Sequence, residues 1–156
     1  MYFETELKAD QEFMVDYSFD YHVNYVELDP AKVSEEQPDF CLEEQAPHIV
    51  FTPYLRELRD ELAGDETNPI ILARRFYDFV TTKVMYSFMR EYFTIECIPE
   101  YCAINLKGDC GVQALLFITL CRMSGIPARW QSGLYATEYY TGCHDWAQFY
   151  VCLLYT

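Results

Sequence analysis

The fold is decided by one stretch of the sequence, KGDCGVQALLFITLCRMSGIPARW, which spans residues 107–130. Its middle part, residues 110–121, is apolar on nearly every side of a helix, and this pattern predicts a helix that is buried all round. We expect the helix to end at Ser124-Gly125, ahead of Pro127. Glycine is common just after a helix, and proline cannot continue one. The chain is therefore expected to fold around this central helix.

Cys110 falls in the first turn of the predicted helix. A first turn has unpaired backbone N–H groups and the positive end of the helix dipole, and both stabilise a thiolate relative to a thiol. The same N–H groups, including that of Cys110, can bind the oxyanion that develops during acyl transfer. Cys121 lies near the other end of the helix, in apolar sequence, and we interpret it as a core residue. This placement predicts Cys110 as a nucleophile.

Two strands are expected after the helix, over residues 126–133 and 146–151, as an antiparallel pair packed against it. His144 stands immediately before the second of these strands. An imidazole at that position would reach the start of the helix, take the thiol proton and later protonate the leaving group. His22, on the polar side of an alternating segment, and His48, in a loop, have no nucleophile near them in the sequence. His144 is therefore the candidate general base.

The two segments before the nucleophile that show helical periodicity are expected to cover the core. Thr52-Pro53 and Asn68-Pro69 each combine an N-cap residue with a proline in the first helical turn. Each pair is followed by an apolar stripe, and Gly64 is suited to close the first helix. The next segment, residues 84–104, is aromatic and lacks clear periodicity, so we expect irregular structure there.

The N-terminal part of the chain has a different character. Apolar residues alternate over residues 13–25, which predicts a strand. Residues 29–47 are rich in acidic residues and proline, which predicts a solvated linker. We therefore expect a β-patterned extension with an acidic linker over residues 1–47, followed by the core domain over residues 48–156.

Composition limits the partners and the setting. The chain of 156 residues has 11 Lys and Arg against 25 Asp and Glu, a formal charge of −14, which disfavours nucleic acid and anionic membranes as partners. No signal peptide or membrane span is evident in the sequence. Seven cysteines form an odd set without CxxC pairs, so we expect reduced thiols, no metal, no cofactor and a cytoplasmic location.

Three motifs follow one another in the second half of the chain: GDC at residues 108–110, GIPAR at 125–129 and CHDWAQFYV at 143–151. Their order, and the spacing from cysteine to histidine, resemble the bacterial transglutaminase-like family. The resemblance implies an α+β papain-like core, with the nucleophile at the N-terminus of a buried central helix packed on an antiparallel sheet. It implies thiol chemistry on amide bonds of protein or peptide substrates, with Cys110 as nucleophile and His144 as general base. Most bacterial relatives resemble peptidases or amidases, which favours hydrolysis over acyl transfer to an amine.

The acid that orients the histidine in this family lies on the next strand, in a Gly-Trp segment, and no such segment follows Val151. We therefore expect a core that is incomplete at its C-terminus. Neighbouring strand residues point to opposite faces, so Asp145 is interpreted as a surface carboxylate and Asp109 as a helix cap. Asn105 or Tyr101 are candidates for an extra oxyanion donor. A catalytically inactive fragment or interaction module stays open as an alternative, and an unpaired sheet edge predicts self-association.

Overall fold

The structure is a computed structural model that describes residues 4, 6, 27–34 and 36–153. The strand predicted over residues 13–25 lies outside the described residues. The elements in chain order are η1 (Pro30–Lys32), α1 (Pro53–Ala63), α2 (Pro69–Lys83), β1 (Met85–Tyr86), η2 (Tyr92–Thr94), α3 (Ile98–Asn105), β2 (Lys107–Gly108), α4 (Cys110–Met123), β3 (Ala128–Ala136) and β4 (Thr141–Phe149).

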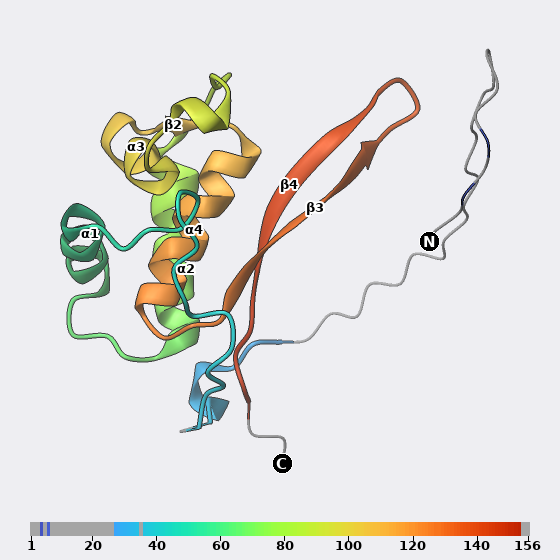
Figure 1. The fold of residues 1–156 in the computed structure, drawn as a ribbon. Coiled ribbons are helices and arrows are strands. Elements are labelled where there is room, and N and C mark those ends of the chain that lie inside the picture. The colour runs from blue at the N-terminus through green and yellow to red at the C-terminus, as the bar shows by residue number, and fades with distance from the viewer. Residues whose placement is uncertain (1–3, 5, 7–26, 35, 154–156) are drawn as a thin grey trace.

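Helix α4 is the centre of the fold, with α1, α2 and α3 on one side and the β3–β4 hairpin on the other (Figure 1). Its side chains are buried on every face, which explains why its sequence shows no polar stripe. Leu115, Leu116, Ile118 and Leu120 are among the largest fully buried side chains. The prediction of a central helix beginning at Cys110 is confirmed.

Both expected outer helices form, and each starts at the predicted cap. The Thr52 hydroxyl accepts a hydrogen bond from the Leu55 N–H at 3.2 Å, and the Asn68 side chain accepts one from the Ile70 N–H at 3.1 Å. Gly64 ends α1 with a φ of 54°, a conformation that a residue with a Cβ rarely adopts. These caps satisfy N–H groups that the first turn leaves without partners.

Residues 84–104 are not uniformly irregular, as the sequence suggested, because they contain the short helix α3. Its buried residues include Ile98, Cys102 and Ala103, which pack in the core beside α4. The eight residues of α3 have apolar side chains on several faces, so the sequence shows no amphipathic stripe there. Burial against α4 stabilises the helix instead. Strand β2 follows α3 and lies just ahead of α4 in the chain. Its residues Lys107 and Gly108 pair in parallel with Met85 and Tyr86 of β1.

The acidic segment over residues 29–47 is attached to the core and is not a free solvated linker. The Ser34 N–H donates to the Cys152 carbonyl at 3.0 Å, and the Ala128 N–H donates to the Cys41 carbonyl at 3.3 Å. The described part of the segment is therefore joined to the end of the hairpin and to the chain after it by backbone hydrogen bonds. The division of the chain into 1–47 and 48–156 stays a prediction.

Arg122 joins three parts of the fold, although its side chain is only 5% exposed. Its Nε donates to the Ala128 carbonyl at 2.8 Å, and its Nη1 donates to the Glu43 carbonyl at 2.7 Å. The residue also lies in the last turn of α4, where the negative end of the helix dipole favours a cation. The buried charge is thus satisfied by carbonyl oxygens and by the helix end.

Replacing Arg122 by methionine is expected to lower the free energy of unfolding by about 2–4 kcal/mol, because two buried carbonyls lose a charged donor. Urea denaturation followed by circular dichroism would measure the change. Arg74→Met is the matched control, since Arg74 is exposed and makes a surface ion pair with Asp78. Its effect should stay within about 0.5 kcal/mol. Equal losses in the two variants would contradict the role given to Arg122.

Candidate active site

Cys110 is the first residue of α4, and Asp109 is its N-cap. The Asp109 Oδ1 atom accepts a hydrogen bond from the Val112 N–H at 3.0 Å and another from the Tyr92 hydroxyl at 2.5 Å. The capping role predicted for Asp109 is therefore confirmed. The Gly111 N–H has no hydrogen-bond partner among the described residues, whereas the Cys110 N–H interacts with the Tyr86 side chain, so the helix start presents one free donor beside the sulfur.

Two tyrosines lie near the helix start, and no pattern in the sequence pointed to either. Tyr92 comes from η2, and Tyr86 comes from β1, whose pairing with β2 places it next to Gly108. Burial raises the pKa of the Tyr92 phenol, and its hydrogen bond to Asp109 raises that pKa further. The pKa of Tyr86 is also raised, first by burial and then by the negative charges of Cys110 and Asp109. Both hydroxyls therefore keep their protons at neutral pH.

Gly111 allows the surrounding groups to close over the helix start. A Cβ at this position would lie 2.7 Å from Trp130 Cη2, 3.2 Å from Asp145 Oδ2 and closer still to the Tyr92 hydroxyl. Any side chain would therefore push the hairpin or Tyr92 away. A hollow of about 410 Å³ lies beside the helix cap, lined by Asp109, Tyr92 and residues 89–91 and 93. Cys110 and Gly111 are not part of its lining.

The hairpin presents Asp145 to the nucleophile. Asp145 Oδ2 lies 4.0 Å from Cys110 Sγ, and the interpretation of Asp145 as an ordinary surface carboxylate is wrong, because it is half-buried in this contact. On the neighbouring strand β3, Asp145 is paired with Ser132. The next pair on the same face is Trp130 with Ala147, and both of these side chains pack against the core. This row of side chains forms the face of the hairpin that covers α4.

His144 lies on the opposite face of β4. Its ring centroid is 6.0 Å from that of Tyr135 and 6.2 Å from that of Trp146, and the side chain is exposed. Consecutive strand residues alternate between faces, so His144 and Asp145 cannot both face Cys110 in one register. The strand also starts at Thr141, earlier than the sequence suggested, which places His144 inside it. The catalytic roles of Cys110 and His144 stay predictions.

The two candidates for an extra oxyanion donor bind other groups. Asn105 Nδ2 donates to the Tyr101 carbonyl at 2.8 Å, and the Arg90 guanidinium lies over the Tyr101 ring at 5.5 Å. No contact of either residue with Cys110 is recorded in the part of the chain that the structure describes. Within the same described residues, no group of three or more His, Cys, Asp or Glu side chains is arranged to hold a metal ion.

The other cysteines differ from Cys110 in their surroundings. Burial raises the pKa of the Cys102 thiol to about 12, and it raises that of the fully buried Cys121 as well. Cys143 on β4 is exposed. Cys102 and Cys121 are therefore protonated core residues at neutral pH, as the sequence predicted for Cys121.

Alkali is expected to destabilise the fold through these two buried thiols. In the unfolded chain they ionise around pH 9, while in the folded chain they hold their protons, so unfolding releases protons above that pH. The free energy of unfolding should then fall by about 1.4 kcal/mol per pH unit for each such thiol, beginning near pH 9. Urea titrations at pH 8 to 10.5 would measure the slope. Cys121→Val should flatten it, and an unchanged slope in that variant would contradict the assignment.

The helices in the described ranges are each too short or too polar to cross a lipid bilayer. No match to a curated protein was found. A solved structure from Cytophaga hutchinsonii, provisionally described as a cysteine protease, is similar with a TM-score of 0.58 and 22% sequence identity. The match covers 70% of this chain and 37% of that one, so the chain spans little more than a third of that protein's length.

This likeness confirms the predicted fold class, an α+β papain-like or transglutaminase-like core with the nucleophile position at the start of the buried helix and an antiparallel hairpin packed on it. The family model of the transglutaminase-like superfamily matches residues 56–153, which is well over half of the chain. That range includes Cys110, His144 and the three motifs that connect them. The chain therefore belongs to the transglutaminase-like superfamily.

Proposed function

We propose that the protein hydrolyses amide bonds of peptide or protein substrates by covalent catalysis at Cys110. The observation that carries the proposal is the position of Cys110 at the start of α4, beside the Gly111 N–H, which has no partner in the described chain. A carbonyl oxygen placed there would accept a hydrogen bond from this N–H as its negative charge develops. Family membership supports thiol chemistry of this kind.

The reaction has two steps. Cys110 Sγ attacks the amide carbonyl carbon, the C–N bond breaks, and the amine leaves with the proton that the thiol gave up. Water then attacks the thioester, which releases the acid and restores the thiol. Each step needs a group that takes a proton and returns it.

We propose His144 as that group. In the structure Asp145 Oδ2 lies 4.0 Å from the sulfur, so a carboxyl group and not an imidazole faces Cys110. A shift of β4 by one residue against its neighbours would exchange the faces of His144 and Asp145. The imidazole would then replace the carboxylate beside Cys110. This shift is part of the proposal and is the step that mutagenesis can test.

A second candidate function is a non-catalytic interaction module. The observation that favours it is the contact of Cys110 with Asp145 in place of a histidine. A thiol next to a carboxylate, with no imidazole, has no efficient base, and in serine hydrolases with a Ser-His-Asp triad an incorrectly held histidine costs about four orders of magnitude in turnover. The fold would then serve only to present its surface to a partner.

The test is incubation of the purified chain with a pool of N-blocked peptides, with and without a primary amine, followed by mass spectrometry of the products. New carboxyl termini would support hydrolysis, and masses increased by the amine would show transfer instead. Products that persist in Cys110→Ala would overturn the proposal, because they would not depend on the thiol. Absence of any product from the intact chain would support the interaction module.

A further inference from the structure

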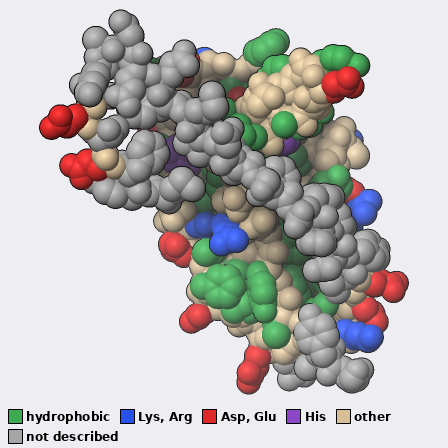
Figure 2. All heavy atoms as spheres, turned by 90° about the vertical axis from the view of Figure 1, so that its right-hand side faces the viewer, with side chains coloured by type: hydrophobic (Ala, Val, Ile, Leu, Met, Phe, Trp, Pro, Cys, Tyr) green, Lys and Arg blue, Asp and Glu red, His purple; other side chains and the backbone are tan. Residues whose placement is uncertain are grey.

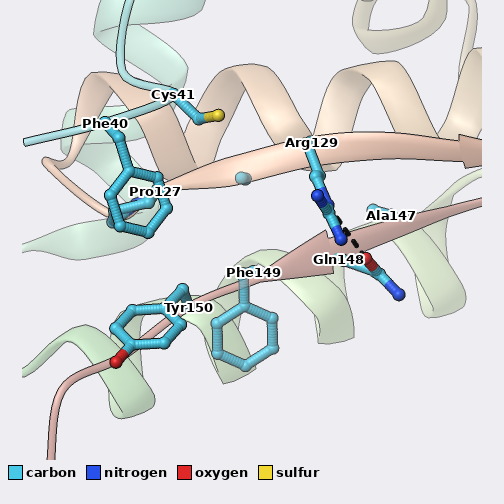
Figure 3. Close-up of a pocket in the computed structure, with 9 residues that line it drawn as sticks. Phe40, Cys41, Pro127, Arg129, Ala147, Gln148, Phe149 and Tyr150 are labelled. Atoms are coloured by element: carbon cyan, nitrogen blue, oxygen red, sulfur yellow. Dashed lines mark hydrogen bonds between the residues drawn. The ribbon is translucent and has the colours of Figure 1, made fainter. Parts of the chain in front are cut away.

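A trough lies at the base of the β3–β4 hairpin, toward the end of α4 that is distant from Cys110 (Figure 3). It has a volume of about 580 Å³ and is lined by residues 40–41, 127–129 and 147–150. Pro127 and Ala128 follow the C-terminus of α4, whereas Cys110 begins that helix, and fourteen helical residues span about 21 Å. The trough is thus a site separate from the helix start. Pockets of this size hold small organic molecules.

One half of the trough is aromatic. The rings of Phe40 and Tyr150 have centroids 5.6 Å apart, and each side chain is about half exposed, at 51% and 50%. Phe149 lies beside them and packs against Phe117 of α4, with ring centroids 6.0 Å apart. Figure 3 shows these rings together at one end of the trough. Phe40 and Tyr150 are in contact with each other, and their exposed faces are suited to pack against a third ring.

The other half carries a single cation. Arg129 Nε donates to Gln148 Oε1 at 3.0 Å, and its side chain makes no ion pair with any described carboxylate. The two terminal nitrogens of the guanidinium are therefore available. The lining contains no Asp or Glu, although the chain as a whole has a formal charge of −14. An arginine with free nitrogens fits a carboxylate, which can accept two parallel hydrogen bonds.

The walls of the trough are fixed by backbone contacts. The Tyr150 N–H donates to the Pro127 carbonyl at 2.9 Å, and the Ala128 N–H donates to the Cys41 carbonyl at 3.3 Å. Arg122 holds the Ala128 carbonyl from the side of α4. A site that is already ordered loses little entropy when a ligand binds.

From these features we propose that the trough binds a small organic carboxylate carrying an aromatic ring, with the carboxylate on Arg129 and the ring packed against Phe40 and Tyr150. The charge of the ligand matches the one cation, and its ring matches the aromatic half. The site works independently of Cys110, so it does not rest on the proposed hydrolysis.

The test uses the full chain, labelled with ¹⁵N, and three probes: 3-phenylpropionate, its neutral analogue 3-phenylpropanamide, and acetate. We expect 3-phenylpropionate to shift the amide signals of residues 128–129 and 147–150 saturably, with a Kd of about 1 mM for a ligand of this size. The amide and acetate should each bind at least about fivefold more weakly, because one lacks the charge and the other lacks the ring.

Two substitutions separate the halves of the site. Arg129→Gln should weaken 3-phenylpropionate about fivefold and leave the amide unchanged, whereas Tyr150→Ala should weaken both. Arg74→Gln, at an exposed cation of α2, and Cys110→Ala should each leave binding unchanged. Salt provides a test without any substitution, since raising its concentration should weaken the carboxylate and not the amide. Equal binding of the carboxylate and the amide, shifts located elsewhere, or no saturable shift would overturn the proposal.

Discussion

Cys110→Ala is expected to abolish amide hydrolysis, with a loss of turnover of about three orders of magnitude or more. The substitution removes the atom that forms the thioester, and no neighbouring group can replace it. The fold should change little, because the Asp109 cap, which holds the helix start, is kept. Turnover is measured with the best peptide found in the product analysis, and stability is measured by urea denaturation.

Cys143→Ala is the matched control for this substitution. Cys143 is exposed on β4 and lies next to His144 in the sequence, so it is more accessible to solvent reagents than half-buried Cys110. Its loss should leave turnover within about twofold of the intact chain, as is usual for surface substitutions without a specific role. If Cys143→Ala removes the activity and Cys110→Ala does not, the nucleophile has been wrongly assigned.

The second large effect is expected from His144→Ala, which should lower turnover by about a hundredfold to ten thousandfold, the range for loss of a general base. The dependence of turnover on pH should change as well. Without the histidine, the residual reaction depends on hydroxide or on a thiolate formed without a general base. His144 is exposed on the outer face of the hairpin, so stability should be nearly unchanged.

Asp145→Ala is the informative partner of this variant. If β4 shifts to bring His144 to the sulfur, Asp145 leaves that position, and its removal should maintain or raise turnover by lifting a negative charge from Cys110. The reverse result, a silent His144→Ala and an inactive Asp145→Ala, would show that the observed register is the working one. The base assignment would then be wrong, although the nucleophile would not.

The central helix and the place of Cys110 at its start could be predicted because they depend on local sequence. An apolar run with Asp109 ahead of it defines α4, and the pairs Thr52-Pro53 and Asn68-Pro69 define the starts of α1 and α2. These signals act within one or two turns of a helix. Neither depends on which other segment packs nearby.

The face that β4 turns to α4 could not be predicted from the sequence in the same way. One row of the strand contains Asp145, Ala147 and Phe149, and the other contains His144 and Trp146, so each row mixes polar and apolar side chains. Alternation fixes a face only when one row is clearly more apolar than the other. The histidine motif suggested that His144 faces the helix, whereas packing of Ala147 against the core selects the other row.

Tyr86 and Tyr92 were missed for a related reason. They reach the helix start through the short parallel pair β1–β2 and the single turn η2, which depend on contacts far apart in the sequence. Elements of two or three residues carry no periodicity that a sequence pattern can show. Strand pairing with Gly108 places the exposed Tyr86, and packing against the core places Tyr92, so only the folded chain reveals that Tyr92 donates to the N-cap of α4.

The central claim is that Cys110 is a reactive nucleophile, and the most direct test is the rate at which iodoacetamide modifies each cysteine at pH 7. Mass spectrometry of peptides from the quenched protein gives the rate for every site. We expect half-buried Cys110 to react faster than exposed Cys143, while Cys102 and Cys121 react only after unfolding. Rates that follow exposure alone, with Cys143 ahead of Cys110, would contradict this claim.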